Sequence, residues 1–161
     1  AAVLGEVQKE PELLDKLKPD LLVIASAPIL KKYIFSKAQY GCLNAHPGWL
    51  PLYRGLGANA YALKHGHDPG VTVHFIDAGI DTGKIIRRER VEVLPGDTVA
   101  GIIDRAVARG AEMVADVIED IKRGELVFET VDEPMGENYR SMPYAEVKKV
   151  NRNIRNRRKG I

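Results

Sequence analysis

Short apolar runs and mixed apolar and polar segments follow one another along this chain, which predicts strands and helices joined by short connections. Residues 20–26 (DLLVIAS) are almost continuously apolar, as expected of a strand covered on both faces of a parallel sheet. Strands are also predicted around residues 41–44 and over 71–79, where apolar and β-branched residues alternate. Interleaved charges in residues 84–94 predict a strand near a sheet edge, and residues 126–131 (LVFETV) predict a last short strand.

Helix signals lie between these strands. The clearest covers residues 98–123, where apolar residues recur at helical spacing after an N-cap at Asp97 or Thr98 and before a terminating Gly124. Shorter helices are predicted in three places, over residues 11–18, within 27–35 and over 57–66. This alternation predicts an α/β, Rossmann-like fold with a mostly parallel sheet flanked by helices. Ligands of such sheets bind beyond the carboxyl ends of the strands.

Apolar content falls from Asp132 onward, so residues 1–131 are predicted to form the main domain and residues 132–161 a C-terminal extension. Seven Lys and Arg residues lie between positions 148 and 159 with no acidic residue among them, which leaves −5 for the rest of a chain of net charge +2. A basic tail on an acidic body can contact RNA, a phosphate-bearing substrate or only solvent, and we favour solvent. The residues expected to anchor the extension are Tyr139, Met142, Tyr144, Val147, Val150 and Ile154.

The 161 residues, 45% apolar and 29% charged, have the composition of a globular protein with a real core. Apolar runs stay well short of the roughly 18 residues that span a bilayer, and the first residues do not resemble a secretory signal. We therefore expect a cytoplasmic protein without a membrane partner. The single Cys42 lies in an apolar segment and is expected to be a small buried residue rather than a catalytic thiol.

Two polar clusters carry the candidate chemistry. Asn44 and His46 lie two residues apart at the end of a predicted strand, so their side chains point to the same side. Asp81 lies in a glycine-containing turn after the strand over 71–79 and could face His46. A carboxylate beside an imidazole raises the pKa of the histidine from about 6.5, so we expect a protonated His46 that, with Asn44, stabilises an oxyanion of acyl transfer.

The residues after His46 are Pro47, Gly48 and Trp49, so the chain offers no Ser or Cys nucleophile there. The attacking group must then belong to a substrate, which indicates direct transfer between two bound molecules, with Asp81 able to accept the proton of an amine. The chain lacks the glycine-rich phosphate loops typical of dinucleotide oxidoreductases and P-loop nucleotide hydrolases.

Residues 43–55 (LNAHPGWLPLYRG) and 70–86 (GVTVHFIDAGIDTGKII) together resemble the paired signature of the folate-dependent formyltransferases. That family includes glycinamide ribonucleotide, methionyl-tRNA and nucleotide-amino-sugar formyltransferases, and the resemblance runs from about Leu14 to Gly124. It implies that Asn44, His46 and Asp81 are catalytic. It also implies formyl transfer from 10-formyltetrahydrofolate to a primary amine, by direct attack through a tetrahedral intermediate, with no metal.

The same resemblance implies a folate pocket built from two loops. Main-chain groups would read the edge of the pterin, while Ile29, Leu30 and Ile76 would cover its face. The residues assigned to it are Ala27, Pro28, Ile29, Leu30, Phe75, Ile76, Asp77, Ala78, Gly79 and Ile80.

Two departures from the family pattern are visible. The opening strand–helix units are missing, so we expect an N-terminally truncated catalytic domain with a bare sheet edge. Gly48 stands where many relatives have serine. The motif Tyr53–Gly55 is typical of the tRNA and sugar branches, and the tail resembles those of sugar formyltransferases. We therefore favour a small-molecule amine as acceptor, and we keep tRNA as an alternative acceptor and a homo-oligomer as an open expectation.

Other interpretations remain open. The chain could be a catalytically incomplete folate-binding or interaction remnant of the same family. Asp81-Thr82-Gly83 is also the triplet of retroviral-type aspartic proteases, although that class requires an all-β chain. Arg54 could contact an acceptor phosphate or be structural. A metal site could be formed by His65, His67, His74 and Asp77.

Overall fold

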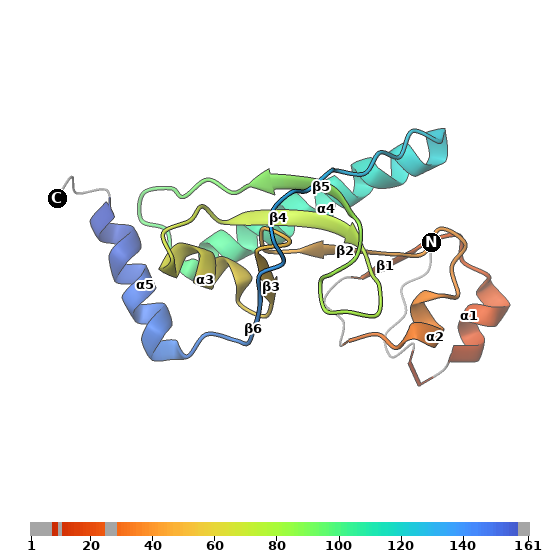
Figure 1. Cartoon of the computed structure of the whole chain (residues 1–161), viewed down its shortest axis with the longest axis horizontal. Coiled ribbons are helices and arrows are strands. Elements are labelled where there is room, and N and C mark those ends of the chain that lie inside the picture. The colour runs from red at the N-terminus through yellow and green to blue at the C-terminus, as the bar shows by residue number, and fades with distance from the viewer. Residues whose placement is uncertain (1–7, 10, 25–28, 158–161) are drawn as a thin grey trace.

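The computed structural model describes residues 8–9, 11–24 and 29–157, and a four-stranded sheet of order β1-β2-β4-β5 lies at its centre (Figure 1). The four strands are β1 (Leu22–Ile24), β2 (Cys42–His46), β4 (Gly70–Phe75) and β5 (Ile85–Arg90). A second, small sheet pairs β3 (Tyr53–Gly55) in parallel with β6 (Glu137–Tyr139). A sheet flanked by helices confirms the predicted α/β class.

The expected strand directions were wrong for most of the sheet. Only β1 and β2 run parallel among the described strands of the main sheet, whereas β2–β4 and β4–β5 are antiparallel. For β4 and β5 the reason is the length of their connection. The short loop 76–84 between β4 and β5 can reverse the chain but cannot carry the crossover that a parallel pair needs.

Strand β1 lies at one edge of the described sheet. The expectation that it is covered on both faces was wrong at Val23, whose exposed fraction is 45%. Among the described residues no strand pairs with the outer edge of β1, and its face is partly open at Val23. At the opposite edge lies β5, where its interleaved charges predicted it.

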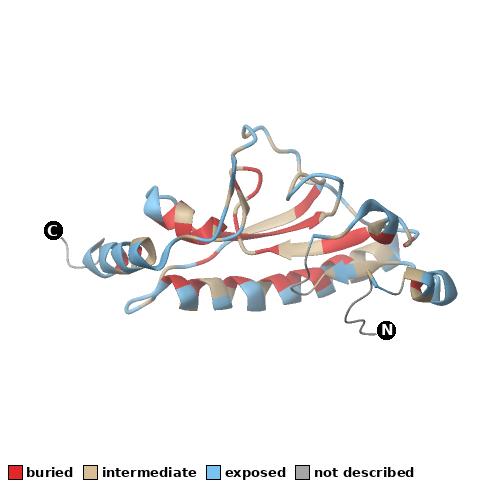
Figure 2. Cartoon of the chain, turned by 90° about the horizontal axis from the view of Figure 1, so that it is seen from below, coloured by how far each residue is buried: buried red, intermediate tan, exposed pale blue. Residues whose placement is uncertain are grey.

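Helices form where they were predicted, with one addition. They are α1 (Pro11–Leu17), α2 (Lys32–Phe35), α3 (Ala58–Lys64), α4 (Val99–Arg123) and the unpredicted α5 (Tyr144–Arg157). The Oγ1 atom of Thr98 caps α4 by accepting from the N–H of Gly101, and Gly124 ends the helix at a φ of 70°. Helix α4 runs along one face of the sheet with its buried residues turned toward it (Figure 2).

The core lies between α4 and the sheet. Ile102 and Met113 of α4 are fully buried together with Val71 and Val73 of β4. At Gly110 the helix and sheet approach so closely that a Cβ would lie 2.9 Å from the Cβ of Ala45.

Helix α5 joins the same core through Val150 and Ile154. The Oδ1 atom of Asn151 also accepts a 2.8 Å hydrogen bond from the N–H of Val99, in the first turn of α4. Tyr144 was wrongly predicted as an anchor, because it is 73% exposed.

Residues 126–131 do not form the predicted strand. In the described structure the backbone of this segment joins β5 through one hydrogen bond, from the N–H of Glu129 to the carbonyl of Ile85 (3.0 Å). Side chains hold the segment instead, since Arg88 donates to the carboxylates of Glu129 and Glu133. The β propensity of the run did not reveal this side-chain attachment.

Within the described residues, none of the helices combines the length and apolar character needed to cross a membrane.

Candidate active site

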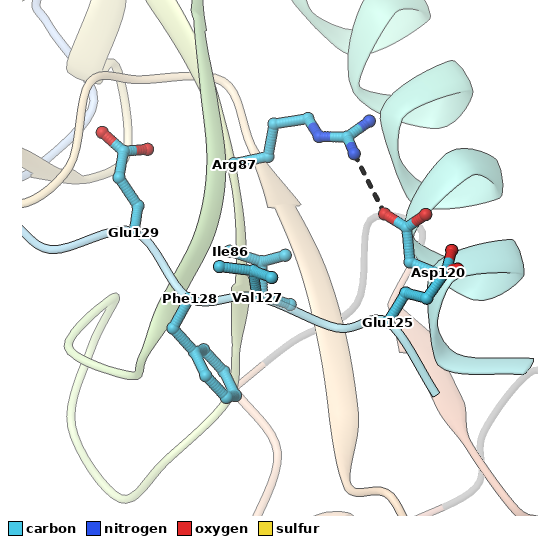
Figure 3. Close-up of a pocket in the computed structure, with 7 residues that line it drawn as sticks. All are labelled: Ile86, Arg87, Asp120, Glu125, Val127, Phe128 and Glu129. Atoms are coloured by element: carbon cyan, nitrogen blue, oxygen red, sulfur yellow. Dashed lines mark hydrogen bonds and ion pairs between the residues drawn. The ribbon is translucent and has the colours of Figure 1, made fainter. Parts of the chain in front are cut away.

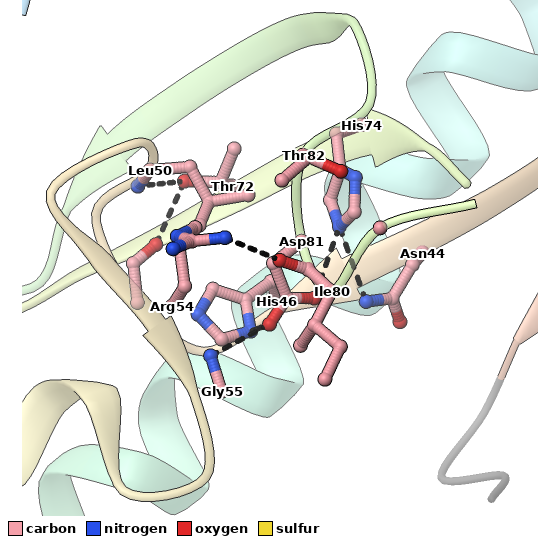
Figure 4. A network of polar contacts seen from close by, with 12 residues as sticks. Asn44, His46, Leu50, Arg54, Gly55, Thr72, His74, Ile80, Asp81 and Thr82 are labelled. Atoms are coloured by element: carbon pink, nitrogen blue, oxygen red, sulfur yellow. Dashed lines mark hydrogen bonds and ion pairs between the residues drawn. The ribbon is translucent and has the colours of Figure 1, made fainter. Parts of the chain in front are cut away.

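Four polar side chains come from facing positions of two neighbouring strands. In the antiparallel register of β2 and β4, Asn44 lies opposite His74 and His46 lies opposite Thr72. Paired residues, and residues two apart on one strand, share a face of the sheet, so these side chains gather on one side near the end of β2 (Figure 4).

Asp81 reaches this cluster from the loop 76–84. Its Oδ2 atom accepts a 2.7 Å hydrogen bond from the N–H of Gly55 and lies 3.6 Å from Nδ1 of His46. Its Oδ1 atom lies 3.6 Å from Nε2 of His74. The backbone at Asp81 has a φ of 53°, a left-handed conformation that aspartate tolerates better than most residues. The structure thus brings together Asn44, His46 and Asp81, the three residues singled out in the sequence.

His46 is nearly enclosed, with an exposed fraction of 5%. Its Nε2 atom lies 2.9 Å from the carbonyl oxygen of Tyr53, which can only accept, so Nε2 carries a hydrogen. Burial lowers the pKa of His46 more strongly than Asp81 raises it. The expectation that Asp81 raises the pKa of His46 was therefore wrong: the net shift is downward, which favours a neutral imidazole whose Nδ1 lone pair faces Asp81.

His74 is a member of the cluster that the sequence analysis missed, having placed it only in a metal set. It is 2% exposed, and its ring nitrogens contact the carbonyl of Phe75 (2.9 Å) and Nδ2 of Asn44 (3.2 Å). Burial, and then the neighbouring His46, lower the pKa of His74. The alternation of Thr72 and His74 along β4 was the available signal, although its meaning depends on the register with β2.

Arg54 fastens the loop that carries Asp81. Its Nη1 atom donates to the carbonyl of Ile80 (3.2 Å), while Nε and Nη2 donate to the carbonyl of Gly136 (3.1 and 2.9 Å). Through these hydrogen bonds the guanidinium connects the loop 76–84 to the segment before β6. Of the two interpretations of Arg54, the structure favours the structural one.

The proposed folate residues fall in two places. Phe75 ends β4 and packs its ring against Phe128, with the centroids 6.0 Å apart. Residues 77–80 form an exposed turn in which the Asp77 carboxylate accepts from the N–H of Gly79 (2.9 Å) and from Thr82 (2.6 Å). Ile29 is 76% exposed and Leu30 is half-buried. Ala27 and Pro28 lie outside the described residues.

Two cavities lie near this end of the sheet. One, of about 300 Å³, is lined by Asp81 together with Glu129, Glu133 and Met135. The other, of about 390 Å³, lies between the end of α4 and the segment 125–129 and contains none of the clustered polar residues (Figure 3). The cavity beside Asp81 is therefore the one connected to the candidate chemistry.

The alternative sites find no support in the geometry. No group of three His, Cys, Asp or Glu side chains within the described ranges is placed to hold a metal ion. His65 and His67 instead direct their Nδ1 atoms to the hydroxyl of Tyr53, at 3.2 and 2.8 Å. The 25-residue helix α4 excludes the all-β fold that an aspartic protease requires. Cys42 is 1% exposed, and burial raises its pKa to about 12, so it is an inert core thiol.

A sequence model of the formyl transferase family matches residues 5–118, a range that includes all three candidate catalytic residues. The chain belongs to this family. The resemblance seen in the sequence is thereby confirmed, and solved formyltransferase structures share the fold of the chain.

Among curated relatives, a methionyl-tRNA formyltransferase from Clostridium beijerinckii is 37% identical over 120 residues, which cover 73% of this chain and 39% of that protein. The chain thus spans about two-fifths of that relative's length. The glycinamide ribonucleotide transformylase 1 structure from Symbiobacterium toebii is 33% identical, with a TM-score of 0.66 over 78% of this chain and 61% of its own.

A more distant formyltransferase shares the fold. PseJ from Anoxybacillus kamchatkensis is 22% identical, with a TM-score of 0.66 over 88% of this chain and 71% of its own. Its structure was solved in complex with UDP-4,6-dideoxy-4-formamido-L-AltNAc and tetrahydrofolate.

Proposed function

We propose that this chain transfers a formyl group from 10-formyltetrahydrofolate to the primary amine of an acceptor. The observation that carries the proposal is the convergence of Asn44, His46 and Asp81 in a member of the formyl transferase family. The tetrahydrofolate in the PseJ structure supports a folate donor for the family. When bound, the donor supplies a formyl carbon that is open to attack by an amine.

The residues present fit a folate. The Asp77 carboxylate holds the exposed turn 77–80, and we assign the remaining main-chain groups of this turn to the edge of the pterin. The apolar side chains of Ile29 and Ile80 have exposed fractions of 76% and 38%, as expected of side chains that contact the flat ring of a bound ligand. We retain the whole assigned set for this role: Ala27, Pro28, Ile29, Leu30, Phe75, Ile76, Asp77, Ala78, Gly79 and Ile80.

Each clustered residue then has a separate task. One N–H of Asn44 is held by His74, and the other, which has no partner among the described residues, can donate to the formyl oxygen as negative charge develops there. The Nδ1 lone pair of neutral His46 accepts the proton that the attacking amine loses. Asp81 favours the imidazolium that results, because its carboxylate lies 3.6 Å from Nδ1. The proton then passes to the departing nitrogen of the donor.

For the acceptor we favour a small-molecule amine, either a nucleotide-linked amino sugar or glycinamide ribonucleotide, over methionyl-tRNA. The cavity of about 300 Å³ beside Asp81 has the size of a small-molecule site, and it places an amine next to the Asp81 carboxylate. We assign residues 1–131 to the catalytic domain and residues 132–161 to a C-terminal extension.

The first experiment is a calorimetric titration of the purified chain with a stable 10-formyltetrahydrofolate analogue, followed by transfer assays on the three amine classes. Saturable binding and transfer to one class are the expected results. Asp81→Asn keeps the shape and the left-handed backbone and should reduce transfer by roughly 100-fold or more. Asp104→Asn makes the same chemical change on the exposed side of α4 and should leave transfer unchanged.

The outcomes separate the alternatives. Binding without turnover on any amine would favour a folate-binding remnant of the family. Absence of binding by a folded sample would reject the proposal for this chain. Substantial transfer by Asp81→Asn would remove the catalytic assignment of Asp81 while leaving the family intact.

A further inference from the structure

The hydrogen bonds of His74 determine which of its ring nitrogens carries the proton. Nδ1 lies 2.9 Å from the carbonyl oxygen of Phe75, and a carbonyl oxygen can only accept, so Nδ1 carries the hydrogen. Nε2 of the neutral ring then presents a lone pair. The ring is 2% exposed, so solvent cannot readily replace these partners.

This lone pair dictates the orientation of the Asn44 amide. The amide atom 3.2 Å from Nε2 must be the donor Nδ2, because the oxygen of a flipped amide would place two acceptors against each other. The second N–H of the amide is thereby directed away from His74. Without His74 the amide could rotate and present its oxygen to the same place.

The groups around His74 favour the neutral ring on balance. Asp81 lies 3.6 Å from Nε2, Asp77 exerts a weaker attraction for a proton, and the ring of His46 lies 6.5 Å away, centroid to centroid. Burial and His46 oppose the two carboxylates and lower the pKa of His74. If the ring were protonated, Nε2–H and the Nδ2 donor of Asn44 would oppose each other. The Asp81 carboxylate would then be the better partner for Nε2–H.

We propose that His74 is a positioning residue for formyl transfer, whose unprotonated Nε2 holds the Asn44 amide with its N–H groups toward the reacting oxygen. The catalytic role of His74 in this inference rests on the proposed function. The tautomer and the amide orientation are properties of the free protein and can be tested without any substrate.

The first test is therefore spectroscopic. Long-range proton–nitrogen NMR of the histidine rings at pH 7.5 should show His74 with a protonated Nδ1 and an unprotonated Nε2. The Asn44 side-chain amide signals should shift in His74→Gln and stay in place in His65→Gln, which changes an exposed histidine. A protonated Nε2 on His74, or unchanged Asn44 signals in His74→Gln, would overturn the proposal whether or not an acceptor is known.

The second test is a double-mutant cycle in the transfer assay. His74→Leu should lower kcat by roughly 10- to 100-fold with little change in the KM for the donor. In an Asn44→Ala background the same change should cost almost nothing further, since His74 acts through Asn44. His74→Gln, whose amide oxygen can accept from Asn44, should recover part of the lost rate.

Two results of the cycle would contradict a positioning role. One is full additivity of the His74→Leu and Asn44→Ala losses, and the other is a His74→Gln enzyme no better than His74→Leu. Circular dichroism and thermal unfolding identify a variant that fails to fold, in which case His74→Gln and the NMR measurement decide. A chain inactive on every amine would defeat the proposed function but not the tautomer and amide orientation that the NMR measures.

Discussion

His46 packs so closely over Gly48 that a Cβ at position 48 would lie 2.5 Å from its Nε2 atom. The same Cβ would lie 2.6 Å from the Cβ of Ala58, at the start of α3. In this chain the imidazole and the start of α3 therefore leave no room for a side chain at position 48, although many relatives carry serine there.

We predict that Gly48→Ala displaces His46 from the carbonyl of Tyr53. Overpacking of this kind costs about 1–3 kcal/mol, which urea unfolding would measure, and formyl transfer should fall with it. NMR titration should also show a changed pKa of His46, because the new position alters its burial. Wild-type stability together with an unchanged His46 titration would show that the site relaxes around the methyl group.

A second prediction concerns pH. Burial lowers the pKa of both His46 and His74 in the folded chain, while in the unfolded chain both titrate near the usual 6.5. Below about pH 6.5 the unfolded state binds more protons than the folded state, so the free energy of unfolding should fall as the pH is lowered. Above that pH this contribution is fully present.

Urea midpoints measured between pH 7.5 and 5.5 test this directly. The double variant His46→Gln/His74→Gln should show a flatter dependence on pH than the wild type, whatever its absolute stability. Equal slopes in the two proteins would mean that other groups account for any loss of stability over this range.

How far the site could be predicted depends on the range of the interactions. The shared side of Asn44 and His46 follows from strand geometry alone, and the turn that carries Asp81 has a local glycine signal. The protonation of His46 could not be predicted, because the carbonyl of Tyr53 and the close packing around Gly48 depend on the folded chain. His74 was missed because its partner Asn44 is 30 residues away in the sequence.

In the fold, too, features set by local sequence were predicted and features set by long-range interactions were not. Helix α4 was predicted almost to the residue, since its cap, period and terminator are all local. Strand direction was not, because it depends on where each connection returns the chain. The apolar spacing of Val147, Val150 and Ile154 could have predicted α5, but the low apolar content around it obscured the signal.

A third prediction uses two glycines of α4. Gly110→Ala should destabilise the fold by about 1–3 kcal/mol, because the new methyl group would lie 2.9 Å from the Cβ of Ala45 and 3.1 Å from Cγ2 of Val71. The matched control is Gly101→Ala, where the nearest atom is 3.7 Å away. That variant should be neutral or more stable by up to about 1 kcal/mol. Equal effects of the two substitutions on the free energy of unfolding would contradict the close packing of α4.

A fourth prediction concerns Arg54, whose guanidinium joins the carbonyls of Ile80 and Gly136. Arg54→Ala should loosen the loop that holds Asp81, so we expect transfer to fall by roughly 10-fold or more and protease cleavage within residues 76–84 to accelerate. Arg140→Ala removes an exposed arginine of the neighbouring segment and serves as the control. A loop that resists cleavage equally in both variants would show that other contacts hold it.

The hydrogen bond between Val99 and Asn151 joins residues 52 positions apart. During translation, which proceeds from the N-terminus, all of α4 is synthesised well before Asn151 is available. Until then the first turn of α4 lacks this partner, and the core lacks Val150 and Ile154. Any core that forms before α5 emerges from the exit tunnel therefore lacks these contacts.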